Sequence, residues 1–298
     1  MELYEQLIYK NNRGESITFG IGSVYHVNVS KDVTGISDLK DTIYSTSSMG
    51  QHGDTYVGVR IEPRDIVLTG KIKDERKEAQ LRLRREALRI LNPELEGTLY
   101  YIYGDFMQKI GAKVDGTPEF YRSKEAASQL FDISFKCLDP FWKDEQETRE
   151  DIASWIGAWI FPTVIDKDDP TSMIFGYREE SLIVDVYNPG HVATGMRIKL
   201  KALGQLTGPS LLNVNTREFL KLNMTLYAGD VVDIDTSYGK KTVVLTRAGV
   251  KSNVYRYIDV DSTFMQLDIG DNVFRYDAES GLDSLDVTLS FNAMYLGV

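Results

Sequence analysis

Two pairs of aspartates have the spacing that carboxylate chemistry uses. Asp233 and Asp235 are two residues apart in a strand-like run, so their side chains face one side, and Asp259 and Asp261 repeat this spacing. Paired carboxylates act as acid and base in sugar hydrolysis or bind Ca²⁺. Neither pair continues into a calcium loop with its glycine and distal glutamate. A solvated strand end or turn is therefore favoured, with a hydrolase acting through Asp233 and Asp235 as the alternative.

No other group of residues predicts catalysis or metal binding. The three histidines lie far apart, and the single cysteine, Cys137, sits in a strand-like run that predicts a small buried side chain. Residues 190–197 have the glycine spacing of a phosphate loop but lack its lysine and hydroxyl residue, so they are expected to form a turn. We therefore expect no catalytic residue, no bound metal and no cofactor.

The composition limits the classes of partner. The chain has 298 residues, of which 42% are hydrophobic, and a formal net charge of −10. A core of ordinary size is expected, whereas a protein that holds nucleic acid by its phosphates normally has a basic stripe. The first residues do not have the pattern of a signal peptide, and the most apolar window, residues 152–165, contains Pro162 and is too short to span a bilayer. We expect synthesis in a cytoplasm and no membrane insertion.

The first half of the chain reads as short strands with one helix. Residues 30–53 are rich in Ser, Thr, Asp and Gly, which predicts a long hairpin or loop of the kind that reaches a neighbour. Asp74 is the expected N-cap of a helix ending at Leu91, with Leu83, Ala87 and Ile90 on its apolar face. Asn92-Pro93 ends this helix, because proline cannot continue the hydrogen-bond ladder.

A polar stretch, residues 143–151, predicts a domain boundary, which we place between residues 145 and 146. After it, alternating strands and frequent turns are typical of a β-sandwich. The chain is thus expected to be mainly β with two domains, residues 1–145 and 146–298.

Two clusters could bind a ligand or a protein. The arginines at 82, 84, 85 and 89 could form a basic patch, but the acidic residues between them favour a solvated or inter-subunit face. The aromatic residues Trp155, Trp159 and Phe161 could stack on a glycan, or pack in a core or at the seam between domains.

Short motifs along nearly the whole chain resemble, in order and spacing, the distal tail protein (Dit) family of phages with long non-contractile tails. In the first half these are residues 51–53, 64–70, 89–93, 97–101 and 135–142. In the second half they are Phe175-Gly176, Asn188-Pro189-Gly190, residues 233–236 and residues 267–272.

The resemblance implies a fold and a role. The N-terminal domain would be a tail-tube-like β-sandwich or barrel with one α-helix and a long hairpin, and the C-terminal domain a galectin-like, jelly-roll or carbohydrate-module-like sandwich. Six copies would form a ring at the tail tip or baseplate of a phage, a prophage or a tailocin, after synthesis in the host bacterial cytoplasm. The ring would join the tail tube protein to the tail-associated fibre or lysin and to receptor-binding proteins for host adhesion. DNA would pass through the lumen without specific binding.

Under this interpretation the functional residues lie at interfaces. Contacts with neighbouring subunits or the tube are expected from Asp32, Lys40, Gln51, His52, Arg82, Arg85 and Arg89. The alternative function is a carbohydrate-binding module that contacts the bacterial cell surface through the aromatic residues named above.

Overall fold

The computed structural model describes residues 5–74, 76–122, 128–151, 155–156, 177–178 and 183–298. The chain forms two compact units. Unit 1 comprises residues 1–145 and 294–298, and unit 2 comprises residues 146–293. Strands dominate both units, as the sequence predicts.

Unit 1 is built on a closed barrel of seven strands in the order β11-β7-β3-β2-β1-β8-β9, closed by the pairing of β9 with β11. These strands are β1 (Gln6–Asn11), β2 (Ser16–Gly20), β3 (Tyr25–His26), β7 (Arg64–Ile72), β8 (Glu96–Tyr103), β9 (Phe106–Val114) and β11 (Gln129–Cys137). Closure pairs the edge strands with each other, which leaves the barrel itself no open edge.

Shorter elements surround the barrel. They are α1 (Val29–Asp32), β4 (Val33–Thr34), the hairpin strands β5 (Asp41–Thr46) and β6 (Thr55–Ile61), the helix α2 (Lys77–Ile90), β10 (Glu119–Arg122), β12 (Trp142–Asp144) and β27 (Met294–Tyr295). Strand β27 pairs with β12, opposite Trp142. The last five residues therefore belong to unit 1, whereas the sequence-based division assigned them to the second domain. Pairing at long sequence separation leaves no local signal.

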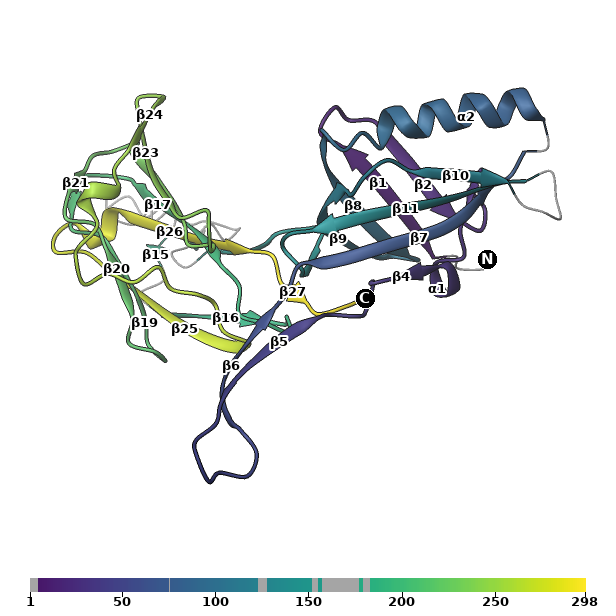
Figure 1. Ribbon diagram of the computed structural model, residues 1–298. Helices are drawn as coiled ribbons and strands as arrows, with labels where there is room; N and C mark the ends of the chain where they lie inside the picture. The colour runs from purple at the N-terminus through teal and green to yellow at the C-terminus, as the bar shows by residue number, and fades with distance from the viewer. Residues whose placement is uncertain (1–4, 75, 123–127, 152–154, 157–176, 179–182) are drawn as a thin grey trace, which may run out of the picture. The chain divides into compact units, whose positions relative to one another are not determined.

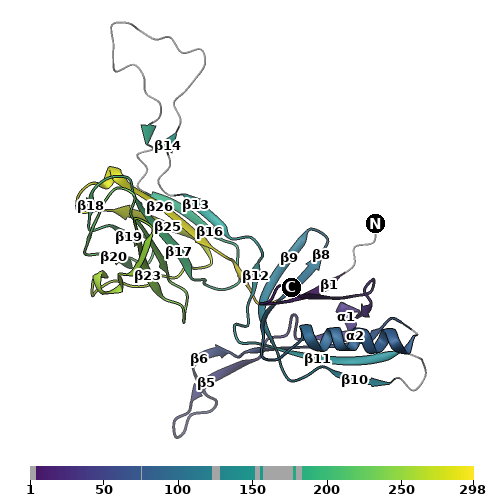
Figure 2. The same ribbon diagram turned by 90° about the horizontal axis from the view of Figure 1, so that it is seen from above.

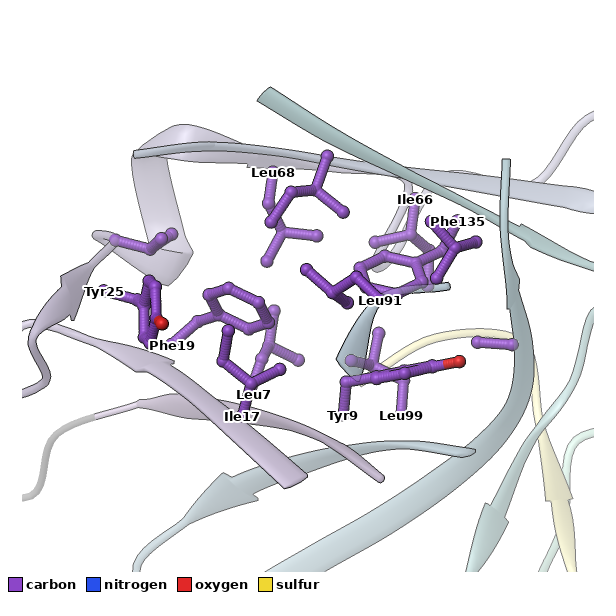
Figure 3. Packing of buried hydrophobic residues seen from close by; sticks show 14 of the residues in the cluster. Leu7, Tyr9, Ile17, Phe19, Tyr25, Ile66, Leu68, Leu91, Leu99 and Phe135 are labelled. Carbon is purple, nitrogen blue, oxygen red and sulfur yellow. The ribbon is translucent and has the colours of Figure 1, made fainter. Parts of the chain in front are cut away.

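Alternation of buried and exposed positions fills the barrel. Strand β7 follows this pattern over its whole length, and its inward residues Ile66 and Leu68 are fully buried. Aromatic rings fill the space between strands, with the ring centroids of Tyr9 and Phe135 5.1 Å apart. Figure 3 shows these side chains converging from several strands, together with Leu91 from the end of the helical segment.

Cys137 is fully buried in this core, as expected. Burial raises the pKa of its thiol to about 12. The folded state therefore disfavours the thiolate, and the thiol is unreactive at neutral pH.

Helix α2 begins at Lys77, so the predicted N-cap at Asp74 is wrong. Asp74 instead accepts a hydrogen bond from the backbone N–H of Arg76 at 2.9 Å and forms a salt bridge with its side chain at 3.1 Å. The N-cap is Arg76, two residues later than predicted, because an aspartate can accept a hydrogen bond from the backbone two residues on. The predicted apolar face is confirmed, since Ala87 and Ile90 are buried.

Unit 2 contains two main sheets. One has the order β13-β26-β17-β22-β23-β24 and the other β16-β25-β19-β20. Their strands are β13 (Thr148–Asp151), β16 (Ile183–Asn188), β17 (Met196–Ala202), β19 (Ser210–Asn213), β20 (Phe219–Lys221), β22 (Val231–Asp235), β23 (Thr242–Arg247), β24 (Val250–Asn253), β25 (Gly270–Asp277) and β26 (Leu285–Phe291). Both sheets bury alternate residues, as in β17 and β25, so each has one apolar face and the two form a sandwich.

Small pieces complete unit 2. They are the paired strands β14 (Trp155–Ile156) with β15 (Tyr177–Arg178) and β18 (Leu206–Thr207) with β21 (Thr225–Leu226), and the 3₁₀ turns η1 (Tyr255–Tyr257) and η2 (Leu282–Ser284). Among the residues that the structure describes, neither α-helix is long and apolar enough to cross a membrane.

We predict that Gly97→Ala destabilises unit 1 by about 1–3 kcal/mol, because it overpacks the barrel. A Cβ at Gly97 would lie 2.4 Å from the ring of Tyr9, which is fully buried. Gly111 lies on the neighbouring strand β9, opposite Thr98, and a Cβ there would meet open space, so Gly111→Ala is the matched control. Equilibrium urea unfolding measures both changes. Equal stability of the two variants would contradict the packing argument.

A candidate assembly surface on the projecting hairpin

Strands β5 and β6 form a two-stranded hairpin that projects from the barrel, here called the arm (residues 41–61; Figures 1 and 2). Neither strand is buried, and only two positions of the arm reach intermediate burial. Six large apolar side chains are exposed on it: Ile43, Tyr44, Met49, Tyr56, Val57 and Val59. Exposed apolar clusters of this kind mark interaction sites.

Both faces of the arm carry apolar groups. Ile43 lies opposite Val59, so their side chains share one face, and they are 65% and 52% exposed. Tyr44 lies on the other face opposite Gly58, which leaves its ring uncovered. The register shifts after Tyr44, so that Val57 is an extra residue, and such a bulge increases the local twist. A free hairpin of two strands is only marginally stable in water.

The tip of the arm has a local hydrogen-bonded structure. The side-chain oxygen of Gln51 accepts from the backbone N–H of Ser48 at 3.3 Å, and its amide donates to Thr55 Oγ1 at 2.9 Å. His52 lies beside it and is exposed. Gln51 and His52, both predicted contact residues, are thus presented at the end of the arm.

The base of the arm is fixed to β7. Gly35 has φ +85°, and a Cβ there would lie 1.9 Å from the carbonyl oxygen of Asp65, so only glycine fits. Lys40, another predicted contact residue, forms a salt bridge with Asp65 at 3.7 Å, and Lys136 forms one at 3.1 Å. These pairs are solvent-exposed and contribute little energy, but they orient the base.

Arg64, at the start of β7, holds this region together. The residue is 2% exposed, and its guanidinium donates to main-chain carbonyls: Nε to Pro140 at 2.9 Å, Nη1 to Gly35 at 2.8 Å and to Ile36, and Nη2 to Leu296. The planar fork suits this task, because its donors point in fixed directions. Burial lowers the pKa of the guanidinium, which nevertheless stays protonated at any physiological pH.

Trp142 reinforces the same contact. Its indole N–H donates to the carbonyl of Ile36 at 3.0 Å, and its ring is fully buried. Ile36 therefore accepts from two buried donors on separate segments. The segment entering the arm is fixed on the barrel, although the arm beyond it is exposed.

A cavity of about 260 Å³ lies next to this base. Its wall includes Glu5, whose carboxylate accepts from Ser30 Oγ at 2.6 Å and from the Tyr101 hydroxyl at 3.2 Å. Burial and the Glu5 charge raise the pKa of Tyr101 to about 12. The cavity is polar, and Asp38 also lines it.

The remaining predicted contact residues lie elsewhere on unit 1. Arg82, Arg85 and Arg89 are exposed on α2, away from the arm in both views (Figures 1 and 2). Arg89 pairs with Glu15 at 3.4 Å. Asp32 ends α1 and accepts from the backbone N–H of Asn28 at 3.1 Å. The structure therefore offers two separate surfaces on unit 1, the arm and the outer side of α2.

The aspartate pairs have structural partners. Asp233 lies 3.8 Å from Lys199, and Asp235 lies 3.8 Å from Arg197, both on the neighbouring strand β17. Asp259 accepts from Asn223 at 2.9 Å and from the backbone N–H of Asp261, and these bonds lower the pKa of its carboxyl.

Two of the predicted glycan-contacting aromatics, Trp159 and Phe161, lie outside the described residues. Trp155 belongs to the short strand β14, for which only the backbone is described. Within the described part of the chain, no group of three or more His, Cys, Asp or Glu residues could hold a metal ion.

Sequence reasoning missed the apolar residues of the arm. It predicted a hairpin or loop over residues 30–53, whereas the second strand runs to Ile61 and residues 29–34 form α1 and β4. The available signal was a run of β-branched and aromatic residues, 55–61, directly after a turn-rich segment. No element was predicted over this run from the sequence, and the structure places it in the projecting hairpin.

Two models of phage tail protein domains match the chain. Residues 12–137 match the phage tail protein RIFT-related domain, and residues 189–295 match the siphovirus-type tail component, C-terminal domain. The chain is thus a structural component of a phage tail. It belongs to the siphovirus-type distal tail protein family.

Solved structures have the same fold. The chain is similar to the SPP1 Dit (gp 19.1) protein, described as a paradigm of the hub adsorption apparatus in phages that infect Gram-positive bacteria, with a TM-score of 0.68, 13% identity, and 97% and 98% of the two chains covered. It is also similar to a chain of the phage P2 baseplate in its activated conformation with Ca, with a TM-score of 0.51, 12% identity and the same coverage. No curated protein matches the chain significantly.

We predict that Arg64→Met lowers the free energy of unfolding by at least about 3 kcal/mol, because the carbonyls of Pro140, Gly35, Ile36 and Leu296 each lose a charged donor. Arg60→Met is the matched control, since Arg60 is exposed and pairs weakly with Glu62 at 3.9 Å. Its effect should stay within about 0.5 kcal/mol. Urea denaturation of both variants measures the difference. A stable Arg64→Met protein would show that the guanidinium does not hold the base.

Proposed function

We propose that this protein is the hub of a phage tail tip, in which six copies form a closed ring. The ring joins the tail tube above to the tail-associated fibre or lysin below, and carries receptor-binding proteins. Its family membership supports a role in the tail, and the exposed apolar arm supports self-assembly.

The arm is the proposed contact between neighbouring subunits. Its apolar residues lie on both faces, and its outer strand edges pair with no other described strand, so a protein surface that covers it removes apolar area from water and extends the sheet. A second copy is the proposed occupant. The arm projects to one side, so the surface of the neighbouring subunit that receives it is a different surface from the arm. Contacts between two different surfaces of identical subunits can close into a ring.

The fixed base makes this contact effective. A flexible arm would lose conformational entropy on docking, whereas an arm held by Arg64, Gly35 and Trp142 is already oriented. The exposed arginines of α2 form a second proposed surface, for the tube or a neighbour. The net charge of −10 suits a lumen that lets DNA pass without binding it, since like charges repel.

We predict a mass of about 202 kDa by light scattering, from 6 × 33.7 kDa, and rings with a central hole in negative stain. The double variant Ile43→Asp, Val59→Asp should give monomers, because docking would bury two charges at a cost of several kcal/mol, on the order of the penalty for unpaired ions.

The matched control is the double variant Val260→Asp, Ile269→Asp. Both residues are exposed apolar side chains of unit 2, and this variant should still form rings. Rings from the arm variant, or loss of rings in the control alone, would contradict the proposed interface.

A further inference from the structure

Unit 2 contains a basic segment within acidic surroundings. Residues 236–258 hold five cationic and no acidic side chains: Lys240, Lys241, Arg247, Lys251 and Arg256. The rest of residues 146–293 holds nine basic and 21 acidic side chains. The segment therefore has a local charge opposite to that of its unit.

The segment lies at the edge of a sheet. It begins with the turn after β22, continues as the edge hairpin β23–β24 and ends in η1 (Figure 1). All five cations are exposed. Arg247 pairs with Asp230 at 2.6 Å, whereas the other four form no salt bridge with any described residue. Four cations thus remain for an external anion.

Aromatic rings alternate with these cations. The Lys241 ammonium lies 5.2 Å from the ring centroid of Phe264 and 5.6 Å from that of Tyr238. The ring of Tyr255 stacks on the ring of Phe264, with their centroids 5.6 Å apart and an angle of 19° between their planes. Arg256, next in the chain, lies over Tyr257 at 4.8 Å. The turn that holds Tyr238 and Lys241, the 3₁₀ turn that begins at Tyr255 and the loop that holds Phe264 therefore form one surface.

The rings at the ends of this stack are open to solvent. Tyr238 is 78% exposed and Tyr255 is 47% exposed. An exposed aromatic face packs against the C–H face of a sugar ring through dispersion and the hydrophobic effect. The ammonium between the rings is held in place by its cation–π contacts and can pair with a nearby anion.

We propose that this basic aromatic patch, formed by Tyr238, Lys241, Tyr255, Arg256 and Phe264, binds a glycan that carries phosphate or carboxylate groups. The sugar rings stack on the two tyrosines, and the anionic groups pair with Lys241 and Arg256. This activity is separate from ring assembly, and the patch lies entirely in unit 2. On a protein of the phage tail, a cell-surface polymer is the natural source of such a ligand.

The surroundings favour a glycan over a nucleic acid. The patch is short, and Asp235 and Asp259 stand at its two ends in the sequence. A nucleic acid has one phosphate per nucleotide and would extend into this acidic region, where it is repelled. The sugar hydroxyls of a glycan can accept hydrogen bonds from neighbouring polar groups and can also donate hydrogen bonds to the carboxylates, whereas the phosphates of a nucleic acid cannot donate to them.

The test measures binding by the full-length protein with isothermal titration at low and high salt. The probes are hexose-substituted poly(glycerol phosphate), polygalacturonate, neutral dextran and an oligothymidylate. The variants Lys241→Glu and Tyr238→Ala probe the patch, with Arg256→Glu as a second charge variant. Lys201→Glu and Tyr187→Ala are matched controls, because both residues are exposed on other strands of unit 2.

We expect at least one of the two anionic glycans to bind. The one with the lower Kd shows whether the patch prefers phosphate or carboxylate groups. Lys241→Glu and Tyr238→Ala should each weaken the Kd roughly tenfold, the scale of one desolvated cation–π or stacking contact. The controls should leave the Kd unchanged, and salt should weaken binding. Absence of binding to both anionic polymers, equal binding of dextran, tighter binding of oligothymidylate, or unchanged affinity in the patch variants would overturn the proposal. Light scattering of the patch variants should give the same assembled mass as the unmodified protein, whether or not the glycan binds. A failure of glycan binding is therefore distinguishable from a failure of ring assembly.

Discussion

The base of the arm depends on one buried guanidinium. Arg64 donates to carbonyls that precede the arm, that follow β11 and that lie near the end of the chain, so one side chain joins three segments of unit 1. A buried charge is costly unless its donors are satisfied, and here main-chain oxygens accept from the guanidinium. The closed barrel then provides the rigid wall from which the arm projects. The exposed apolar side chains of the arm, which none of the described residues of unit 1 buries, are thereby held in a defined direction.

The two units show different surface chemistry. Unit 1 exposes apolar side chains on the arm and arginines on α2, which suits contact with other protein subunits. Unit 2 exposes tyrosines beside cations on a sheet edge, which suits a polar ligand with negative charge. This division agrees with a tail component that both assembles and meets its surroundings. Arginine and tyrosine are also among the residues that are enriched at protein interfaces.

Local patterns predicted much of the fold. Period-two alternation identified strands such as β7 and β17, and the apolar face of α2 followed from helical spacing. The cap at Asp74 was wrong because two local hydrogen-bond patterns compete for one aspartate, and sequence does not decide between them. The role of Arg64 was not predictable, since its acceptors are backbone carbonyls up to 232 residues away. The arm was predicted as a hairpin, but its exposure depends on where the barrel ends, which no local pattern contains.

The basic patch was hidden by the total charge. A net charge of −10 argued against a protein that holds nucleic acid by its phosphates. Screening limits the reach of each charge to roughly 8–10 Å at physiological salt, so a local basic cluster can act independently of the total. Its aromatic members come from three loops, and only the fold brings Phe264 beside Lys241 and Tyr255.

The most direct test of the central claim is an electron cryomicroscopy map of the assembled protein. We expect a closed ring in which residues 41–61 of each subunit lie against the barrel of the next, with Ile43 and Val59 buried. A ring whose arms remain in solvent, with the subunits joined through other surfaces, would contradict it.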